Sequence, residues 1–210
     1  MKVDGSPGAS VGRKRDPRIE PLVTAAAVTV YARDGWAGFS FEAVAREAGV
    51  GKPALYRRWE SREELLVQAM DTLRLPTAID VGSLRADLLD YAYQWVEWYS
   101  DQSRGLAALR LAADTISNPP LNEVHKRLIV RPRTEAAREI TRRAIDRGEV
   151  ADTLHSATAI ELLVGAMQIH WMYTKESSLP EMRRTFRAHA ERLVDIIVAG
   201  TGAIASGRPD

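Results

Sequence analysis

Apolar residues recur every three or four positions along most of the chain, and this period most constrains its fold. From Arg18 to Arg33 the apolar side chains follow it, and Gly35 stands where such a helix can end. The same period returns at 83–100, 104–116, 121–147, 153–174 and 179–199. It is typical of amphipathic α-helices, and no stretch alternates apolar and polar residues between hairpin turns. The sequence therefore predicts an all-α fold of about nine helices.

Several residues mark where these helices begin, end or divide. Ser61 and Glu64 have the S-x-x-E spacing of a capping box, in which side chains satisfy backbone donors at a helix start. Gly148 and Gly200 stand where a left-handed C-cap residue is expected. Pro132 is predicted to kink or divide the segment 121–147, because proline lacks the helical N–H donor.

Composition excludes several classes of protein. The chain has 210 residues, of which 45% are hydrophobic, so it can bury a sizeable core. It has no cysteine, which excludes disulfides, thiolate metal ligands and a cysteine nucleophile. Neither a secretory signal nor a run of about 18 apolar residues is present. We therefore expect a cytoplasmic protein with no membrane partner.

The N-terminal arm, residues 1–16, is rich in Gly, Ser and Pro and is predicted to be disordered. Its inner end carries Arg13, Lys14 and Arg15, and Arg18 follows shortly after. These side chains could enter a DNA minor groove or follow the phosphate backbone. A solvated tail is an equally open interpretation.

The stretch FSFEAVAREAGVGKPALYRRWESREELL, residues 39–66, predicts two short helices joined by a tight turn. Ser40 can cap a first helix that buries Val44 and its apolar neighbours. Gly49 can end that helix, because glycine adopts a positive φ at little steric cost. Pro53 belongs near the start of the second helix, where its missing N–H is harmless. Together these features indicate a helix-turn-helix.

The second helix, about residues 52–58, is predicted to expose side chains suited to DNA. Lysine or arginine can donate to guanine, a small methyl group can contact thymine, and tyrosine or arginine can hold a phosphate. The Ser61-capped helix offers another phosphate site at its start. The A-x-x-x-G-V spacing alone would also fit any helical hairpin. The candidate DNA-binding residues are Ser40, Lys52, Pro53, Ala54, Tyr56, Arg57, Arg58 and Arg62.

Residues 40–66 resemble the DNA-binding signature of tetracycline-repressor-type (TetR family) transcriptional regulators. A capping serine, the A-x-x-x-G-V turn, K-P-A-L-Y, R-R-W and a second capped helix occur in that order. The resemblance is strong over residues 17–75 and elsewhere rests on helix number and length. It implies a three-helix DNA-binding domain, joined by a fourth helix to a larger domain, residues 76–210, that dimerises and usually binds a small molecule.

The resemblance also implies roles for single residues. Ser40 and Tyr56 would hold phosphate, while Lys52, Ala54 and Arg57 would face bases or the nearby backbone. Serine at position 40 replaces the more common threonine, and arginine at position 62 stands where lysine is usual. Both departures keep the hydroxyl or the charge, so DNA binding is still expected.

Two aromatic clusters in residues 76–210, DYAYQWVEWYSD and GAMQIHWMYTK, predict either a plain core or an effector pocket. Rings with polar tips and adaptable methionines can line a cavity for an apolar or aromatic ligand. His170 by itself fits a hydrogen-bonded or interface histidine better than a metal ligand, and we expect no metal or cofactor. The candidate ligand-binding residues are Tyr91, Trp95, Trp98, Tyr99, Met167, His170 and Trp171.

The last two helices are expected to pack antiparallel and to form a homodimer, because each has more apolar surface than one neighbour can cover. A four-helix interface across a two-fold axis would bury the excess. The two predicted apolar faces are Leu154, Ala157, Ile160, Val164 and Trp171 on one helix, and Phe186, Leu193, Ile196 and Ile197 on the other.

These features together predict a homodimeric repressor that a small apolar or aromatic effector releases from a palindromic operator. Movement is expected to pass through the helix from Ser61 to about Arg74. One alternative is a DNA-binding regulator without a small-molecule ligand, whose C-terminal domain serves only dimerisation or a protein partner. A helical enzyme is a remote alternative, since the chain has no H-E-x-x-H, G-x-S-x-G, P-loop or dinucleotide glycine pattern.

Overall fold

The computed structural model describes residues 16–151, 156–174 and 178–206, and every regular element in this part of the chain is a helix. Since α7, η1 and α8 follow one another without a break, these elements form nine helical units, and the all-α prediction is confirmed. The N-terminal arm lies outside the described residues except for Asp16. The elements are α1 (Ile19–Gly38), α2 (Phe41–Ala48), α3 (Lys52–Tyr56), α4 (Arg62–Asp71), α5 (Leu84–Tyr99), α6 (Gln102–Ser117), α7 (Pro120–His125), the π-helical η1 (Lys126–Val130), α8 (Arg131–Asp146), α9 (Ser156–Thr174) and α10 (Leu179–Ser206).

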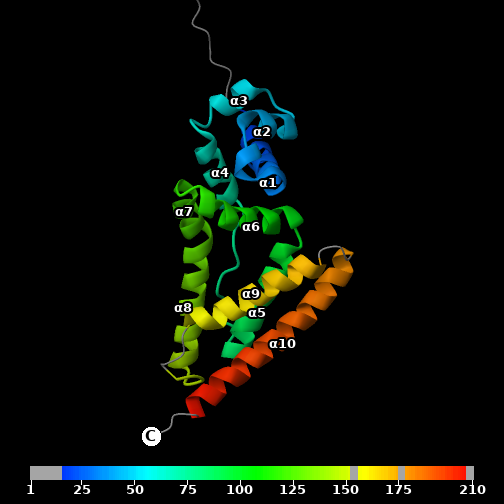
Figure 1. Cartoon of the computed structure of the whole chain (residues 1–210). Coiled ribbons are helices and arrows are strands. Elements are labelled where there is room, and N and C mark those ends of the chain that lie inside the picture. Colours follow the sequence, from blue (N-terminus) through cyan, green and yellow to red (C-terminus); the bar gives the residue numbers. More distant parts are fainter. Residues whose placement is uncertain (1–15, 152–155, 175–177, 207–210) are drawn as a thin grey trace, which may run out of the picture.

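The helices form two stacked groups (Figure 1). At one end, α1 packs against α2 and α4, and α3 lies at the outer tip. At the other end, α5 lies among α8, α9 and α10, while α6 lies between the two groups and packs along α1. One continuous set of buried apolar residues extends from Val23 in α1 to Ile197 in α10. None of the described helices is both long and apolar enough to cross a lipid bilayer.

Most of the predicted helix ends are confirmed. The Ser61 hydroxyl accepts from the Glu64 N–H at 3.1 Å, and Glu64 Oε2 accepts from the Glu60 N–H at 2.7 Å. Gly148 follows α8 with φ of 72°. The prediction that Gly200 ends the last helix is wrong, since α10 continues to Ser206. A glycine inside a helix costs only about 1 kcal/mol, which favourable packing elsewhere can offset.

Two interruptions shape the long helices. Gly35 has φ of 64° and ψ of −170°, which breaks the regular path of α1 before its last turn. Near Pro132 the predicted helix 121–147 changes its hydrogen-bond pattern without ending, because a π-helical turn, Lys126–Val130, directly precedes Arg131 and Pro132. Such turns arise where the regular hydrogen-bond ladder is interrupted, and they are frequent at functional sites.

Candidate nucleic-acid interface and effector region

The helix-turn-helix is built from local hydrogen bonds. The Ser40 hydroxyl caps α2 by accepting from the Ala43 N–H at 3.2 Å. Gly49 adopts the left-handed conformation, with φ of 66° and ψ of 28°, and ends α2. The N–H of Val50 then donates to the Ala45 carbonyl at 3.0 Å, which closes the turn. The predicted geometry of residues 40–56 is therefore present.

Four predicted DNA-binding side chains are exposed on or next to α3. Tyr56 is 60% exposed, and its ring lies edge-on to Phe41 with the centroids 4.8 Å apart. Lys52 Nζ lies 2.9 Å from Glu42 Oε1, an exposed pair of the kind that contributes little stability and can exchange for a phosphate. Arg57 is exposed, and its side chain makes no hydrogen bond or ion pair with the residues that the structure describes. Pro53 is exposed in the first turn.

Two residues predicted to be exposed are not. Ala54 is only 7% exposed, and Arg58 is half-buried. The Arg58 guanidinium folds back along α3, where Nη1 donates to the Ala54 carbonyl and Nη2 to the Asp16 carbonyl, both at 3.1 Å. These contacts tie the end of α3 to the chain that enters α1. The prediction that Ala54 and Arg58 face outward is therefore wrong.

Arg62, a predicted phosphate ligand, lies against the corner between α1 and α2. Its guanidinium carbon lies 4.0 Å from the centroid of the Trp36 ring. Its Nη1 donates to the carbonyl groups of Phe39, at 3.1 Å, and of Trp36, at 3.4 Å. The side chain thus stabilises the corner, and phosphate binding by Arg62 stays a prediction.

Sequence reasoning missed the contact between α6 and the end of α1. Asp114 Oδ2 accepts from the Tyr31 hydroxyl at 2.7 Å and from the Trp36 N–H at 3.0 Å. Arg110 donates to the carbonyl groups of residues 32–33, at 2.6 and 2.9 Å. Burial, followed by the hydrogen bond to Asp114, raises the pKa of Tyr31. Arg110 and Asp114 lie one helical turn apart, but that spacing alone would not have indicated their partners.

Replacing Asp114 by alanine is expected to lower the free energy of unfolding by about 2–4 kcal/mol. The change leaves two donors, on Tyr31 and Trp36, without their acceptor, and each such loss costs about 1–3 kcal/mol. Urea denaturation followed by circular dichroism measures the difference. Asp146→Ala is the matched control, since Asp146 forms an exposed ion pair with Arg142. Equal free energies of unfolding for the two variants would contradict a stabilising role of the Asp114 hydrogen bonds.

The two predicted aromatic clusters meet in the interior. Trp95 lies at the centre, with ring centroids 6.2 Å from Tyr91, 5.2 Å from Trp98 and 5.5 Å from Tyr99. Tyr99 in turn stacks on Trp171 of α9 at 5.1 Å. All five rings are buried, and so is Met167. The sequence therefore identified residues that come together, and most of them pack as core.

Two of the cavities are lined in part by residues of the η1 turn. The larger, of about 550 Å³, lies between the end of α4 and the η1 turn. The smaller, of about 340 Å³, lies between α8 and α9. Ile129 of η1 lines both. The smaller cavity is lined by His125, Ile129, Val130, Arg133, Thr134, Ala137, Ile160, Glu161, Val164 and Gly165.

Family models match both parts of the chain. The model described as "Tetracyclin repressor-like, C-terminal domain" matches residues 78–197, and the model described as "Bacterial regulatory proteins, tetR family" matches residues 23–69. The chain belongs to the TetR family. The match to residues 23–69 includes all of α2 and α3, so the helix-turn-helix described above is that of a family of DNA-binding transcriptional regulators.

Relatives agree with the TetR assignment. The HTH-type transcriptional regulator AqdR of Rhodococcus erythropolis is 30% identical over 159 residues, 74% of this chain and 75% of AqdR. The DNA-binding transcriptional repressor TetR of Mycobacteroides abscessus is 38% identical over 68 residues, 31% of this chain and 36% of that protein. The crystal structure of the regulator FadR from Bacillus subtilis, in complex with stearoyl-CoA, shares the fold with a TM-score of 0.67 and 16% identity, covering 86% of this chain and 98% of that chain.

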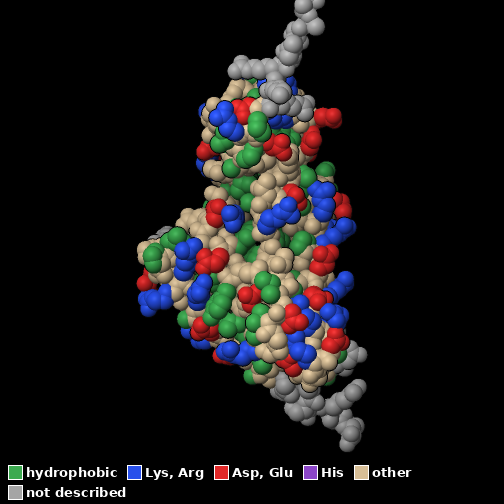
Figure 2. All heavy atoms as spheres, turned by 180° about the vertical axis from the view of Figure 1, so that it is seen from behind, with side chains coloured by type: hydrophobic (Ala, Val, Ile, Leu, Met, Phe, Trp, Pro, Cys, Tyr) green, Lys and Arg blue, Asp and Glu red, His purple; other side chains and the backbone are tan. Residues whose placement is uncertain are grey.

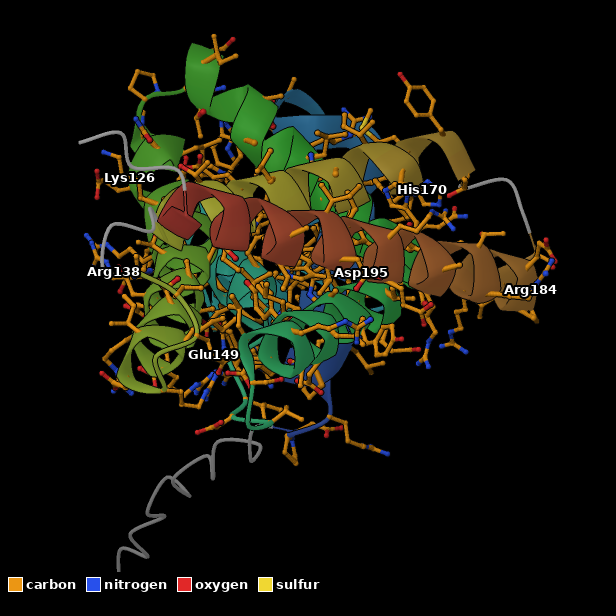
Figure 3. All side chains as sticks on the ribbon, turned by 90° about the horizontal axis from the view of Figure 1, so that it is seen from below. Lys126, Arg138, Glu149, His170, Arg184 and Asp195 are labelled. Carbon is orange, nitrogen blue, oxygen red and sulfur yellow. The ribbon has the colours of Figure 1, made fainter. Side chains whose placement is uncertain are left out.

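In this TetR-family chain α9 and α10 run side by side (Figure 3). The face predicted for dimerisation is largely used inside the chain, because Ile160, Val164 and Trp171 on α9 and Phe186 and Ile197 on α10 are all buried. Leu154 lies outside the described residues, and the side chain of Ala157 is not described. The exposed large apolar residues of the two helices are Leu162, Ile169, Met172, Tyr173, Leu179 and Ile196. Among the predicted interface residues, Ile196 is exposed and Leu193 half-buried.

His170 of α9, a predicted ligand-binding residue, stacks on His189 of α10. The ring centroids lie 4.1 Å apart at an interplanar angle of 10°. Both Nε2 atoms are buried and have no hydrogen-bond partner among the described residues. Of the two predicted roles of His170, the hydrogen-bonded one therefore does not hold for Nε2, and the interface role stays a prediction. Burial lowers the pKa of both rings, and the nearby Arg192 lowers both further.

The histidine pair is expected to make the protein less stable in acid. Because the folded-state pKa values lie below the ordinary value of 6.5, the unfolded chain binds more protons as the pH falls through 6.5. The stability difference is absent well above pH 6.5 and grows toward pH 5. Urea denaturation across this range measures it. The double variant His170→Gln/His189→Gln should show a shallower decline, and an unchanged decline would contradict this role.

Proposed function

We propose that this chain is a cytoplasmic, homodimeric repressor, without enzymatic activity, that a small effector releases from a palindromic operator. The observation that carries the proposal is that one chain has both an exposed polar surface suited to DNA and an exposed apolar surface suited to a second subunit. Tyr56 and Arg57 are exposed at the helix-turn-helix, and apolar residues such as Ile169 and Ile196 are exposed on α9 and α10. A repressor role is further supported by the name of the Mycobacteroides abscessus relative.

A two-fold axis beside α9 and α10 would place two helix-turn-helix units on one duplex, where each could contact one half-site. Two states that differ in the separation of these units would bind the operator differently. An effector that binds better to the poorly binding state would then release the DNA. Support for an effector comes from FadR of Bacillus subtilis, a regulator of the same fold whose crystal structure is a complex with stearoyl-CoA.

Two sets of contacts support the proposed coupling between effector binding and the helix-turn-helix. One is the set of hydrogen bonds from Asp114 and Arg110 on α6 to the end of α1. The other is η1, since Ile129 lines both the cavity beside α8 and the cavity beside α4. We therefore propose that movement passes from the effector site to the helix-turn-helix through α6 as well as through α4.

A reporter assay tests the repressor role. The duplex that the purified protein selects from a random pool is placed between a promoter and a reporter gene, and the protein is expressed from a second plasmid. A repressor lowers reporter output at this site, while a scrambled site of equal composition is unaffected. Increased output, with selective binding to the same duplex, would show an activator instead.

A further inference from the structure

The positively charged side chain of Arg133 on α8 lies against the aromatic core and has no carboxylate partner among the described residues. Its guanidinium carbon lies 4.8 Å from the ring centroid of Trp95, which is fully buried. Its Nε is buried and has no hydrogen-bond partner, and no ion pair of Arg133 occurs within the part of the chain that the structure describes. Arg133 is half-buried, and a charge that is partly removed from water favours a partner of opposite sign or a set of acceptors. The Trp95 ring and the nearby Tyr99 hydroxyl carry no opposite charge, so they meet this need only in part.

Two further polar groups lie next to this guanidinium. The indole Nε1 of Trp95 and the hydroxyl of Tyr91 are buried and make no hydrogen bond of standard geometry with the described residues, although they lie near each other and the indole offsets part of the rise that burial causes in the pKa of the hydroxyl. The two rings touch edge to face at 6.2 Å. Burial raises the pKa of Tyr91, so its hydroxyl stays protonated and able to donate. Neither residue lines the cavity between α8 and α9, so Arg133 is the member of this group that an occupant of the cavity can reach.

Arg133 is also part of the wall of the 340 Å³ cavity between α8 and α9. That volume falls in the range of small-molecule sites, about 300–1,000 Å³. Apolar side chains, among them Ile129, Ile160 and Val164, make up much of the wall. The cavity therefore combines an unpaired cation with an apolar surface.

The other titratable groups of this wall leave Arg133 free to bind an anion. Burial lowers the pKa of His125, and the charge of Arg133 lowers it further, so His125 is neutral at neutral pH. Glu161 lines the same cavity but is exposed to solvent, and it forms no ion pair with Arg133. Arg133 and Glu161 thus give the wall two charges of opposite sign that do not neutralise each other directly.

We propose that the effector is an amphipathic carboxylate, whose carboxylate group pairs with Arg133 while its hydrocarbon part lies along Ile129, Ile160 and Val164. The inference rests on the proposed function, and it narrows the predicted apolar or aromatic effector to one with an anionic end. An occupant would also touch Ile129, whose other side faces the cavity beside α4. An effector in this cavity would therefore bind close to the end of α4, the helix that joins the DNA-binding domain to the rest of the chain.

Isothermal titration of the purified full chain tests the proposal with two matched pairs of probes. Octanoate and 1-naphthoate are compared with octanamide and 1-naphthamide, which keep the shape and remove the charge. We expect at least one acid to bind about tenfold or more tightly than its amide, because a charge-assisted pair is lost in the amide. Arg133→Gln should abolish this preference, whereas Arg133→Lys should retain part of it.

Glu161→Gln is the matched control, since it neutralises the opposite charge in the same wall. It should leave the affinity for the acid unchanged or raise it, the reverse of Arg133→Gln. Equal binding of acid and amide, an unchanged preference in Arg133→Gln, or no binding of either acid would overturn the inference. A mobility shift of the selected duplex by the wild-type protein is run alongside. Retained DNA binding with failed acid binding refutes this inference alone, while lost DNA binding refutes the proposed function.

Discussion

The double variant Ile169→Asp/Ile196→Asp is expected to sediment as a monomer and to bind the operator at least about a hundredfold more weakly than the wild type. The two side chains are 52% and 68% exposed on α9 and α10. Two aspartates per chain in an apolar interface would leave four uncompensated charges about the two-fold axis, which desolvation makes unfavourable. A monomer then binds one half-site without the gain from linked binding.

Sedimentation velocity and a mobility shift on the same samples measure the two effects. Ile116→Asp is the matched control, because Ile116 is 86% exposed near the end of α6, a helix that packs mainly on α1, α7 and α5. This control should stay dimeric with unchanged affinity. A double variant that remains a dimer would show that the subunits meet through another surface.

Replacing Arg57 by alanine is expected to weaken operator binding about tenfold or more and to reduce its salt dependence. Arg57 is exposed at the end of α3 and unpaired among the described residues, so it can approach DNA without breaking an internal contact. Each lost phosphate contact lowers the slope of log K against log salt by about one unit, and a dimer would lose two. Tyr56→Phe should weaken binding by a smaller factor, since it removes the hydroxyl alone.

Fluorescence anisotropy of a labelled operator at several salt concentrations measures both quantities. The control is Arg138→Ala, which removes another exposed arginine, on α8 (Figure 3), a helix of the other group from α3 (Figure 1). Over the face shown in Figure 2, basic and acidic side chains are mixed across the C-terminal group of helices, so one charge lost there should have little effect. If Arg57→Ala matched this control in affinity and slope, the proposed DNA-binding surface would be wrong.

The helices and the helix-turn-helix could be predicted because their causes are local. A period of three and four residues, the Ser40 cap and the positive φ of Gly49 all lie within a few residues of the structure they produce. Even so, α10 continues through Gly200, so glycine at this position does not end the helix. Local patterns therefore indicated the elements better than their ends.

Roles that depend on distant partners could not be predicted. Arg58 and Arg62 look like free cations in the sequence, yet each donates to backbone carbonyl groups far along the chain, 42 residues away at Asp16 and 23 at Phe39. Likewise, Asp114 meets Tyr31 across 83 residues. Such pairs leave no periodic trace, because the fold alone brings them together.

The predicted dimer face illustrates a related limit. Periodicity identified apolar residues on the last two helices, but it could not tell which of them the chain buries against itself. Phe186 and Ile197 pack inside, while Ile169 and Ile196 are left exposed. Amphipathicity therefore predicts that an apolar face is buried. Only the tertiary structure shows whether the same chain or a second subunit buries it.

The most direct test of the central claim is selection of bound duplexes from a random DNA pool, followed by titration of the selected site at several salt concentrations. A TetR-family dimer that presents two copies of α3 predicts a palindromic site, two chains per duplex and a steep loss of affinity with salt. No enriched sequence, together with weak binding that is equal for all duplexes, would contradict the assignment of α2 and α3 as an operator-binding surface.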